Sequence, residues 1–138
     1  QPKLVALAGF MRILSDNFVR RYQDRLINIH PSLLPSFPGL ATHARALHEG
    51  VKIHGCTVHF VTPQLDHGPI IIQAAVAVLP EDTEASLANR VLQQEHRIFP
   101  QAVRWFMNDQ VKVTGGAVQI AAHTSVSQIT LYSPGLAE

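Results

Sequence analysis

The chain has 138 residues, of which 46% are hydrophobic and 15% are charged, and its formal net charge at neutral pH is +1. This composition excludes a disordered chain, which combines low hydrophobicity with a high net charge. The length suits one domain with one core, and no run of lysine and arginine points to nucleic acid or a membrane surface as a partner. The lone cysteine, Cys56, excludes an internal disulfide and favours a reducing compartment. No segment reaches the ~20 apolar residues that a membrane-spanning helix needs.

The first part of the chain alternates predicted strands with predicted helices. The residues from Pro31 to Gly39 interrupt this order, because three prolines there exclude regular structure. The apolar run at the start is expected to be a strand buried on both faces, and Gly50 is expected to end the second helix. In chain order these elements are a strand over 3–9, a helix over 17–25, a strand over 26–30 and a helix over 42–49.

The second part begins with two strands, over 53–62 and 70–79, joined by a loop that permits a hairpin-like return. A long helix is expected over 80–110, with Thr83 at its start and Pro100 kinking or dividing it. A weak hairpin signal follows, with Gly115 and Gly116 at the turn. The alternation indicates an α/β fold with parallel strands and right-handed crossovers, in which ligands bind beyond the carboxyl ends of the strands.

Asn28 and His30 are two residues apart at the end of a predicted strand, so their side chains share one face of the sheet. For such a short motif alone, the structural interpretation is the simpler one, with Asn28 capping a turn and His30 bonding a backbone carbonyl. Asp66 changes this balance, because it sits between a strand and a Gly-Pro pair in a loop, where catalytic carboxylates are common.

These three side chains suit acyl-type transfer through a tetrahedral intermediate. A carboxylate orients an imidazole and favours its protonated form, and an asparagine amide can donate to a developing oxyanion. No nucleophile accompanies them, because Cys56 is predicted mid-strand and Ser32 adjoins the proline turn. Direct attack by a substrate amine or by water is therefore expected. The eight histidines show no metal-binding spacing, so no metal site is predicted.

Four motifs in this order carry a resemblance to a known family: "NIHPSLLPSFPG", "THARAL", "HGCTVHFV" and "LDHGPIIIQ". Over residues 3 to about 108 the chain resembles the phosphoribosylglycinamide formyltransferases, the folate-dependent formyltransferases of purine biosynthesis. Methionyl-tRNA formyltransferases typically read "SLLPRWRG" and formyltetrahydrofolate deformylases "NIHHSFLP" at the corresponding place. Pro31 and the "THARAL" segment favour the first family.

The resemblance implies a Rossmann-like formyltransferase fold, with a mostly parallel sheet flanked by helices, a C-terminal β-hairpin and a long helix. It implies that residues 1–108 are the C-terminal catalytic part of a formyltransferase domain and that residues 109–138 form a hairpin and tail. The implied activity is transfer of a formyl group from 10-formyltetrahydrofolate to glycinamide ribonucleotide in the cytoplasm. No metal, nucleic acid or membrane is implied, and a homodimer is left open.

The family's functional residues map onto this chain by position. Asn28, His30 and Asp66 match the catalytic residues, with His30 as proton donor. Glu95 matches a glutamate that contacts the ribonucleotide. The remaining matches, which together with Asn28 and Asp66 bind the folate, are Met11, Arg12, Ile13, Leu14, Thr62, Pro63, Gln64 and Leu65.

The sequence departs from the family in one respect. In the family an N-terminal strand and a Gly-Ser-Asn-type loop bind the substrate phosphate, and this sequence has no counterpart to either. We therefore expect a piece of a longer enzyme that turns over weakly or not at all by itself. Two alternatives are kept: a formyltetrahydrofolate deformylase, in which water replaces the amine, and a non-catalytic folate-binding fragment. The sequence leaves the cis or trans state of the Leu34–Pro35 bond undecided.

Overall fold

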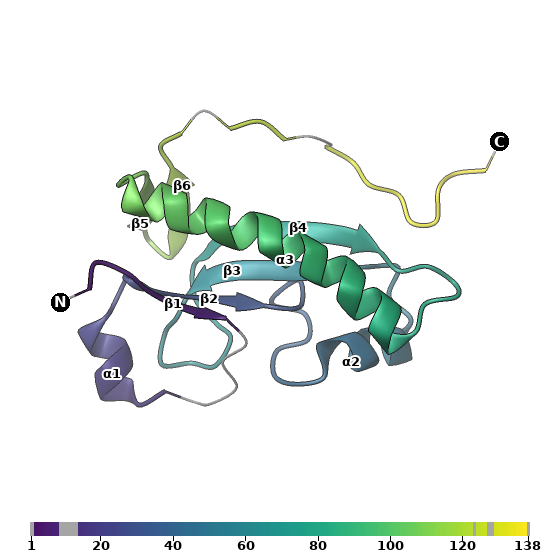
Figure 1. Ribbon diagram of the computed structural model, residues 1–138, viewed down its shortest axis with the longest axis horizontal. Coiled ribbons are helices and arrows are strands. Elements are labelled where there is room, and N and C mark those ends of the chain that lie inside the picture. Colours follow the sequence, from purple (N-terminus) through teal and green to yellow (C-terminus); the bar gives the residue numbers. More distant parts are fainter. Residues whose placement is uncertain (1, 9–13, 123, 127–128, 138) are drawn as a thin grey trace.

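The computed structural model describes residues 2–8, 14–122, 124–126 and 129–137. Nine helices and strands follow one another in these ranges (Figure 1). The strands are β1 (Val5–Ala8), β2 (Leu26–His30), β3 (Ile53–Phe60), β4 (Ile70–Ala77), β5 (Val111–Thr114) and β6 (Ala117–Ile120). The helices are α1 (Asp16–Arg21), α2 (Thr42–Glu49) and α3 (Glu84–Met107). The fold is therefore of the α/β class, as the sequence predicts.

The main sheet has the order β1-β2-β3-β4 and is mixed rather than mostly parallel. β1 and β2 are parallel, whereas β2 pairs antiparallel with β3, and β3 pairs antiparallel with β4. The expectation of a mostly parallel sheet is therefore wrong for the described strands. A crossover helix would return the chain to the far end of the sheet, but residues 31–52 leave and re-enter at the same end, which reverses β3.

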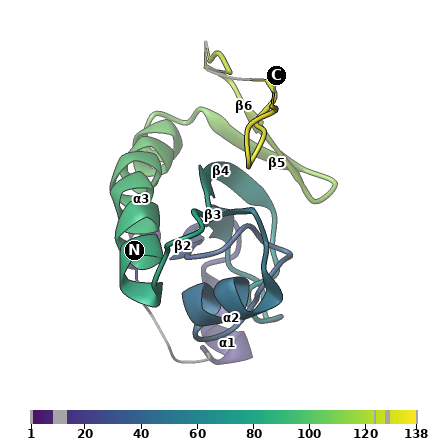
Figure 2. The same ribbon diagram turned by 90° about the vertical axis from the view of Figure 1, so that its right-hand side faces the viewer.

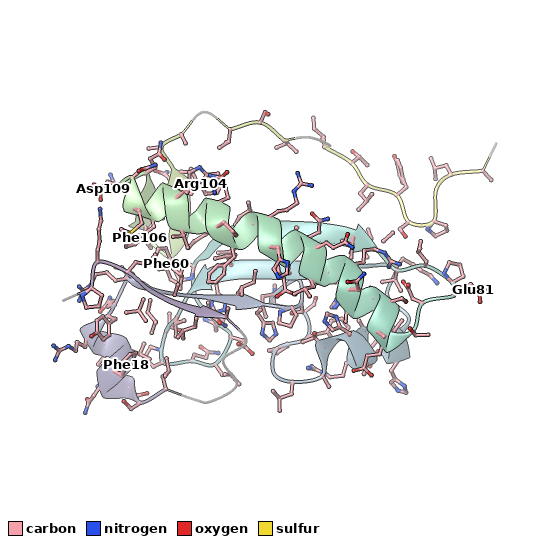
Figure 3. All side chains as sticks on the ribbon, in the orientation of Figure 1. Phe18, Phe60, Glu81, Arg104, Phe106 and Asp109 are labelled. Carbon is pink, nitrogen blue, oxygen red and sulfur yellow. The ribbon has the colours of Figure 1, made fainter. Side chains whose placement is uncertain are left out.

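Helix α3 covers one face of this sheet and builds the core with it (Figure 2). Ile27 and Ile29 of β2 and Val58 of β3 pack in one buried cluster with the apolar stripe of α3, which consists of Leu87, Val91, Ile98 and Ala102. Near the end of α3 the rings of Phe60 and Phe106 lie 6.2 Å apart between centroids (Figure 3). Asn28 and His30 alternate with Ile27 and Ile29 along β2 and so point to the other side of the strand from these core residues.

Two details of the helices differ from the sequence prediction. Helix α3 begins with the expected capping box of Thr83 and Ser86 but continues as one helix through Pro100. Burial of Ile98 and Ala102 on either side of the proline outweighs the one backbone hydrogen bond that it removes. Helix α1 ends at Arg21, before the predicted residue 25, and Asp24 adopts a positive φ of 59° in the turn that follows.

Strand β1 was expected to be buried on both faces, and this expectation is wrong. Ala6 and Ala8 are exposed, whereas Val5 and Leu7 are partly buried. Among the described strands β1 lies at the edge of the sheet, and its face that carries Ala6 and Ala8 is exposed.

The hairpin β5–β6 is confirmed, with Gly115 and Gly116 at the turn in positive-φ conformations of 59° and 80°. Its apolar side chains Val111, Val113, Val118 and Ile120 pack against the core cluster. Within the described ranges, no helix combines the length and the apolar character needed to cross a membrane.

Candidate active site

His30 is the last residue of β2, and the turn that follows it is tied to the neighbouring strands by side chains. The hydroxyl of Thr57 donates to Ser32 O (2.7 Å) and accepts from Leu34 N (3.1 Å). Gln73 Nε2 donates to Leu34 O at 3.0 Å. Leu34–Pro35 is a cis peptide bond. The three polar contacts fix the backbone directly after His30, and hence the direction in which this segment leaves the sheet.

Asp66 reaches His30 from the loop between β3 and β4. Since β3 runs antiparallel to β2, this loop starts at the far end of the sheet from His30 and folds back over the face that carries Asn28. Gly68 makes that path possible, because a Cβ there would lie 1.9 Å from Phe60 O. Phe60 N also donates to Pro69 O at 2.9 Å. Asp66 itself has a positive φ of 48°, a conformation that aspartate adopts more readily than most residues.

His30 and Asp66 form a buried ion-pair geometry, with 3.5 Å between His30 Nδ1 and Asp66 Oδ1 and side-chain exposures of 8% and 10%. The other ring nitrogen, Nε2, lies 3.0 Å from Phe37 O. The other carboxylate oxygen, Oδ2, accepts from Gly39 N at 2.7 Å. Both ring nitrogens therefore face oxygen acceptors, an arrangement that the imidazolium form satisfies at both positions.

The segment from Phe37 to Gly39 thus contacts both members of this pair through its backbone. Phe37 and Ala41 have positive φ angles of 53°, and Gly39 has one of 85°. A positive φ strains Phe37 and Ala41, which carry a Cβ. Because Nε2 is engaged with the Phe37 carbonyl, a ligand atom that bonds to this nitrogen must first displace that contact.

A cavity of about 700 Å³ opens beside this pair, between the segment after Pro38 and the first turns of α3. Asn28, His30, Asp66 and Glu95 are among the residues that line it. Burial raises the pKa of the Glu95 carboxyl above its ordinary value, and His96 acts in the opposite direction. Leu40, Leu65 and Leu92 give the same wall exposed apolar surface. The cavity therefore suits a ligand that has polar groups at one end and an apolar body.

A second, smaller cavity of about 60 Å³ lies on the sheet face under the loop that carries Asp66. Most of the residues predicted to bind the folate meet here: Leu14, Asn28, Thr62, Pro63, Gln64, Leu65 and Asp66. The other three, Met11, Arg12 and Ile13, lie outside the described residues. Glu95 lines the larger cavity but not this one, and Asn28, Leu65 and Asp66 line both.

Three histidines in this region were not singled out from the sequence. His43 lines the larger cavity, and its Nδ1 lies 3.1 Å from Nε2 of the buried His54. Burial lowers the pKa of both, that of His54 to about 4. His59 lines the smaller cavity and is 2% exposed. The position of His59 depends on how the strands pair, and that of His43 on a contact with a residue eleven positions further along the chain. The spacing of residues in the sequence reveals neither.

Among the described residues, no three His, Cys, Asp or Glu side chains lie close enough to hold a metal ion.

An α/β sheet that carries an asparagine, a histidine and an aspartate beside a cavity fits a formyltransferase, and the comparison with family models agrees, because the formyl transferase family matches residues 1–103. The chain belongs to that family. It is 54% identical over 112 residues to the phosphoribosylglycinamide formyltransferase of Escherichia coli, an alignment that covers 81% of this chain and 53% of the relative. The chain thus spans about half the length of this curated relative.

Solved structures show the same likeness in three dimensions. The phosphoribosylglycinamide formyltransferase of Anaplasma phagocytophilum matches with a TM-score of 0.86 and 51% identity, over 89% of this chain and 61% of that protein. A formyltetrahydrofolate deformylase from Pseudomonas syringae matches with a TM-score of 0.82 and 36% identity, over 86% of this chain and 40% of that protein.

Proposed function

We propose that the protein transfers a formyl group from 10-formyltetrahydrofolate to the amine of glycinamide ribonucleotide, a step of purine biosynthesis. The observation that carries this proposal is the convergence of Asn28, His30 and Asp66 beside a cavity of about 700 Å³, in a member of the formyl transferase family. The 54% identity to a phosphoribosylglycinamide formyltransferase supports this choice of substrate.

The reaction begins when the substrate amine attacks the formyl carbon and forms a new C–N bond. The carbonyl oxygen becomes an oxyanion, which the Asn28 amide and the protonated His30 stabilise by hydrogen bonds. Collapse of this tetrahedral species breaks the bond between the formyl carbon and N10 of the folate. His30 gives a proton to N10, and Asp66, through water, accepts the proton that the amine loses. Until these proton transfers occur, the negative charge on Asp66 offsets the positive charge on His30. After them both side chains are neutral, and a proton passed from Asp66 to His30 restores the starting state.

The two cavities suggest how the substrates divide the site. We place the folate pterin against the loop over 62–66, beside the smaller cavity, and its remaining part along Leu40, Leu65 and Leu92. We place the ribonucleotide at Glu95 in the larger cavity. We assign the catalytic part to residues 1–108 and a supporting role to residues 109–138. We also propose a cytoplasmic location, on the family resemblance.

The likeness to a formyltetrahydrofolate deformylase supports a second candidate, in which water attacks the formyl carbon and formate leaves. The test supplies 10-formyltetrahydrofolate labelled in the formyl group, with and without glycinamide ribonucleotide. Transfer predicts label in the ribonucleotide and little formate. Release of labelled formate at the same rate in both reactions would instead identify the hydrolase. Binding of a folate analogue without either product would contradict both.

A further inference from the structure

His59 lies directly opposite Asn28 on the neighbouring strand. The antiparallel register of β2 and β3 pairs these two residues, so their side chains share the face of the sheet that carries the site. On its other side β3 is paired with β4, and the register there shifts between Val58 and His59, as at a β-bulge. Bulges re-aim side chains and are frequent beside active sites.

The hydrogen bonds of His59 leave one ring nitrogen without a partner. Nδ1 lies 2.9 Å from Phe60 O, and since a carbonyl only accepts, Nδ1 carries the proton. Burial also lowers the pKa of His59, which favours the neutral ring. Nε2 is then a bare acceptor, and it is buried with no partner among the described residues.

Asn28 also has a buried acceptor without a hydrogen-bond partner. Its Oδ1 is likewise buried and unpartnered among the described residues. Two acceptors cannot bond each other, but one water molecule can donate a hydrogen to each of them. Both side chains line the cavity of about 60 Å³, which exceeds the ~15 Å³ that a water needs and offers polar partners.

We propose that His59 is a positioning residue for formyl transfer: through a bridging water it holds Oδ1 of Asn28 inward and turns the amide nitrogen toward the reaction cavity. This inference rests on the proposed function, because the orientation matters only if Asn28 donates to the oxyanion. Without the bridge the amide rotates freely between two orientations, and only one of them presents N–H donors to the reacting carbonyl.

The test compares two variants of the protein, each of which keeps one of the two hydrogen-bonding positions of the His59 ring. His59→Asn retains a donor for Phe60 O but removes the Nε2 acceptor, whereas His59→Gln places an acceptor near the Nε2 position. We expect His59→Asn to lower kcat about 10-fold or more with little change in KM, and His59→Gln to recover most of that loss.

A double-mutant cycle separates positioning from a general loss of structure. In an Asn28→Ala background, His59→Asn should have no further effect on kcat. Val58→Ala is the matched control: it points into the core on the opposite face, so it should lower the melting temperature and affect kcat equally in both backgrounds. The side-chain amide protons of Asn28 give a readout independent of turnover, and their NMR signals should exchange faster with solvent in His59→Asn.

Two results would overturn the positioning role: wild-type kcat in His59→Asn, or the same fractional loss in the Asn28→Ala background. Neither of these results would contradict the proposed function. That function fails instead if the Asn28→Ala variant keeps full transfer activity.

Discussion

At the scale of single residues, Asp66 combines a charge with an unusual backbone conformation. Its carboxylate faces His30 and the Gly39 amide while its φ is +48°. Asparagine tolerates the same conformation and is nearly the same size. The Asp66→Asn variant therefore isolates the charge from the geometry of the loop.

We predict that Asp66→Asn lowers kcat for formyl transfer about 100-fold or more, because the neutral amide removes the negative charge that lies 3.5 Å from Nδ1 of His30. The melting temperature should stay close to the wild-type value, since Oδ1 of asparagine can still accept from Gly39. Steady-state kinetics with a parallel thermal melt checks this. Loss of activity together with unfolding would contradict a purely electrostatic role.

A second prediction concerns His54 and the dependence of the free energy of unfolding on pH. Burial first, and then the nearby His43 and His30, lower its pKa in the folded protein to about 4. In the unfolded chain it titrates near its ordinary value of ~6.5. Between these two pKa values the unfolded state therefore binds more protons than the folded state. The free energy of unfolding thus decreases as the pH falls from about 6.5 toward 4.

Urea unfolding midpoints across this pH range should fall less steeply for His54→Gln than for the wild type. His48→Gln serves as the control, because His48 is exposed on the same helix as His43. Parallel curves for wild type and His54→Gln would show that His54 is not the titrating group.

At the scale of elements, the loop between β3 and β4 depends on Gly68. A Cβ there would overlap Phe60 O at 1.9 Å, so Gly68→Ala must displace the loop that carries Asp66. We predict a loss of about 1–3 kcal/mol in the free energy of unfolding together with a loss of transfer activity.

Gly135→Ala is the matched control, because nothing lies within 4 Å of its Cβ position. It should leave stability and activity unchanged in urea titrations and kinetic assays. Wild-type behaviour of Gly68→Ala would mean that the loop has room the structure does not show.

The existence of the elements and the two hairpins between neighbouring strands, β3–β4 and β5–β6, were predictable here, whereas the pairing of β3 with β2 was not. The apolar runs and the capping signal at Thr83 identify β2, β3 and α3 in the sequence. Whether β3 runs parallel or antiparallel to β2 depends on where residues 31–52 lead the chain, which no local pattern encodes. The site shows the same limit. Side-chain type and spacing single out Asn28 and His30 and allow His30 to bond a backbone carbonyl, but that this carbonyl belongs to Phe37 depends on the path of the chain and has no sequence signal.

At the scale of the whole molecule, the C-terminal hairpin completes the core. Val111 and Val118 pack against the buried cluster, whereas Val126 and Leu136 of the following segment are exposed. Deleting residues 111–138 should therefore lower the melting temperature markedly, and deleting residues 124–138 should change it little. Equal effects of the two deletions, measured by calorimetry, would assign the stabilisation to the tail instead.

The central claim is that the cluster of Asn28, His30 and Asp66 performs formyl transfer, and His30→Ala tests it most directly. The measurement is the rate at which labelled formyl passes from 10-formyltetrahydrofolate to glycinamide ribonucleotide in the full-length protein, wild type against variant. Loss of the proton donor predicts a rate at least ~100-fold lower in a variant that remains folded. A folded His30→Ala protein that transfers formyl at the wild-type rate would contradict the claim.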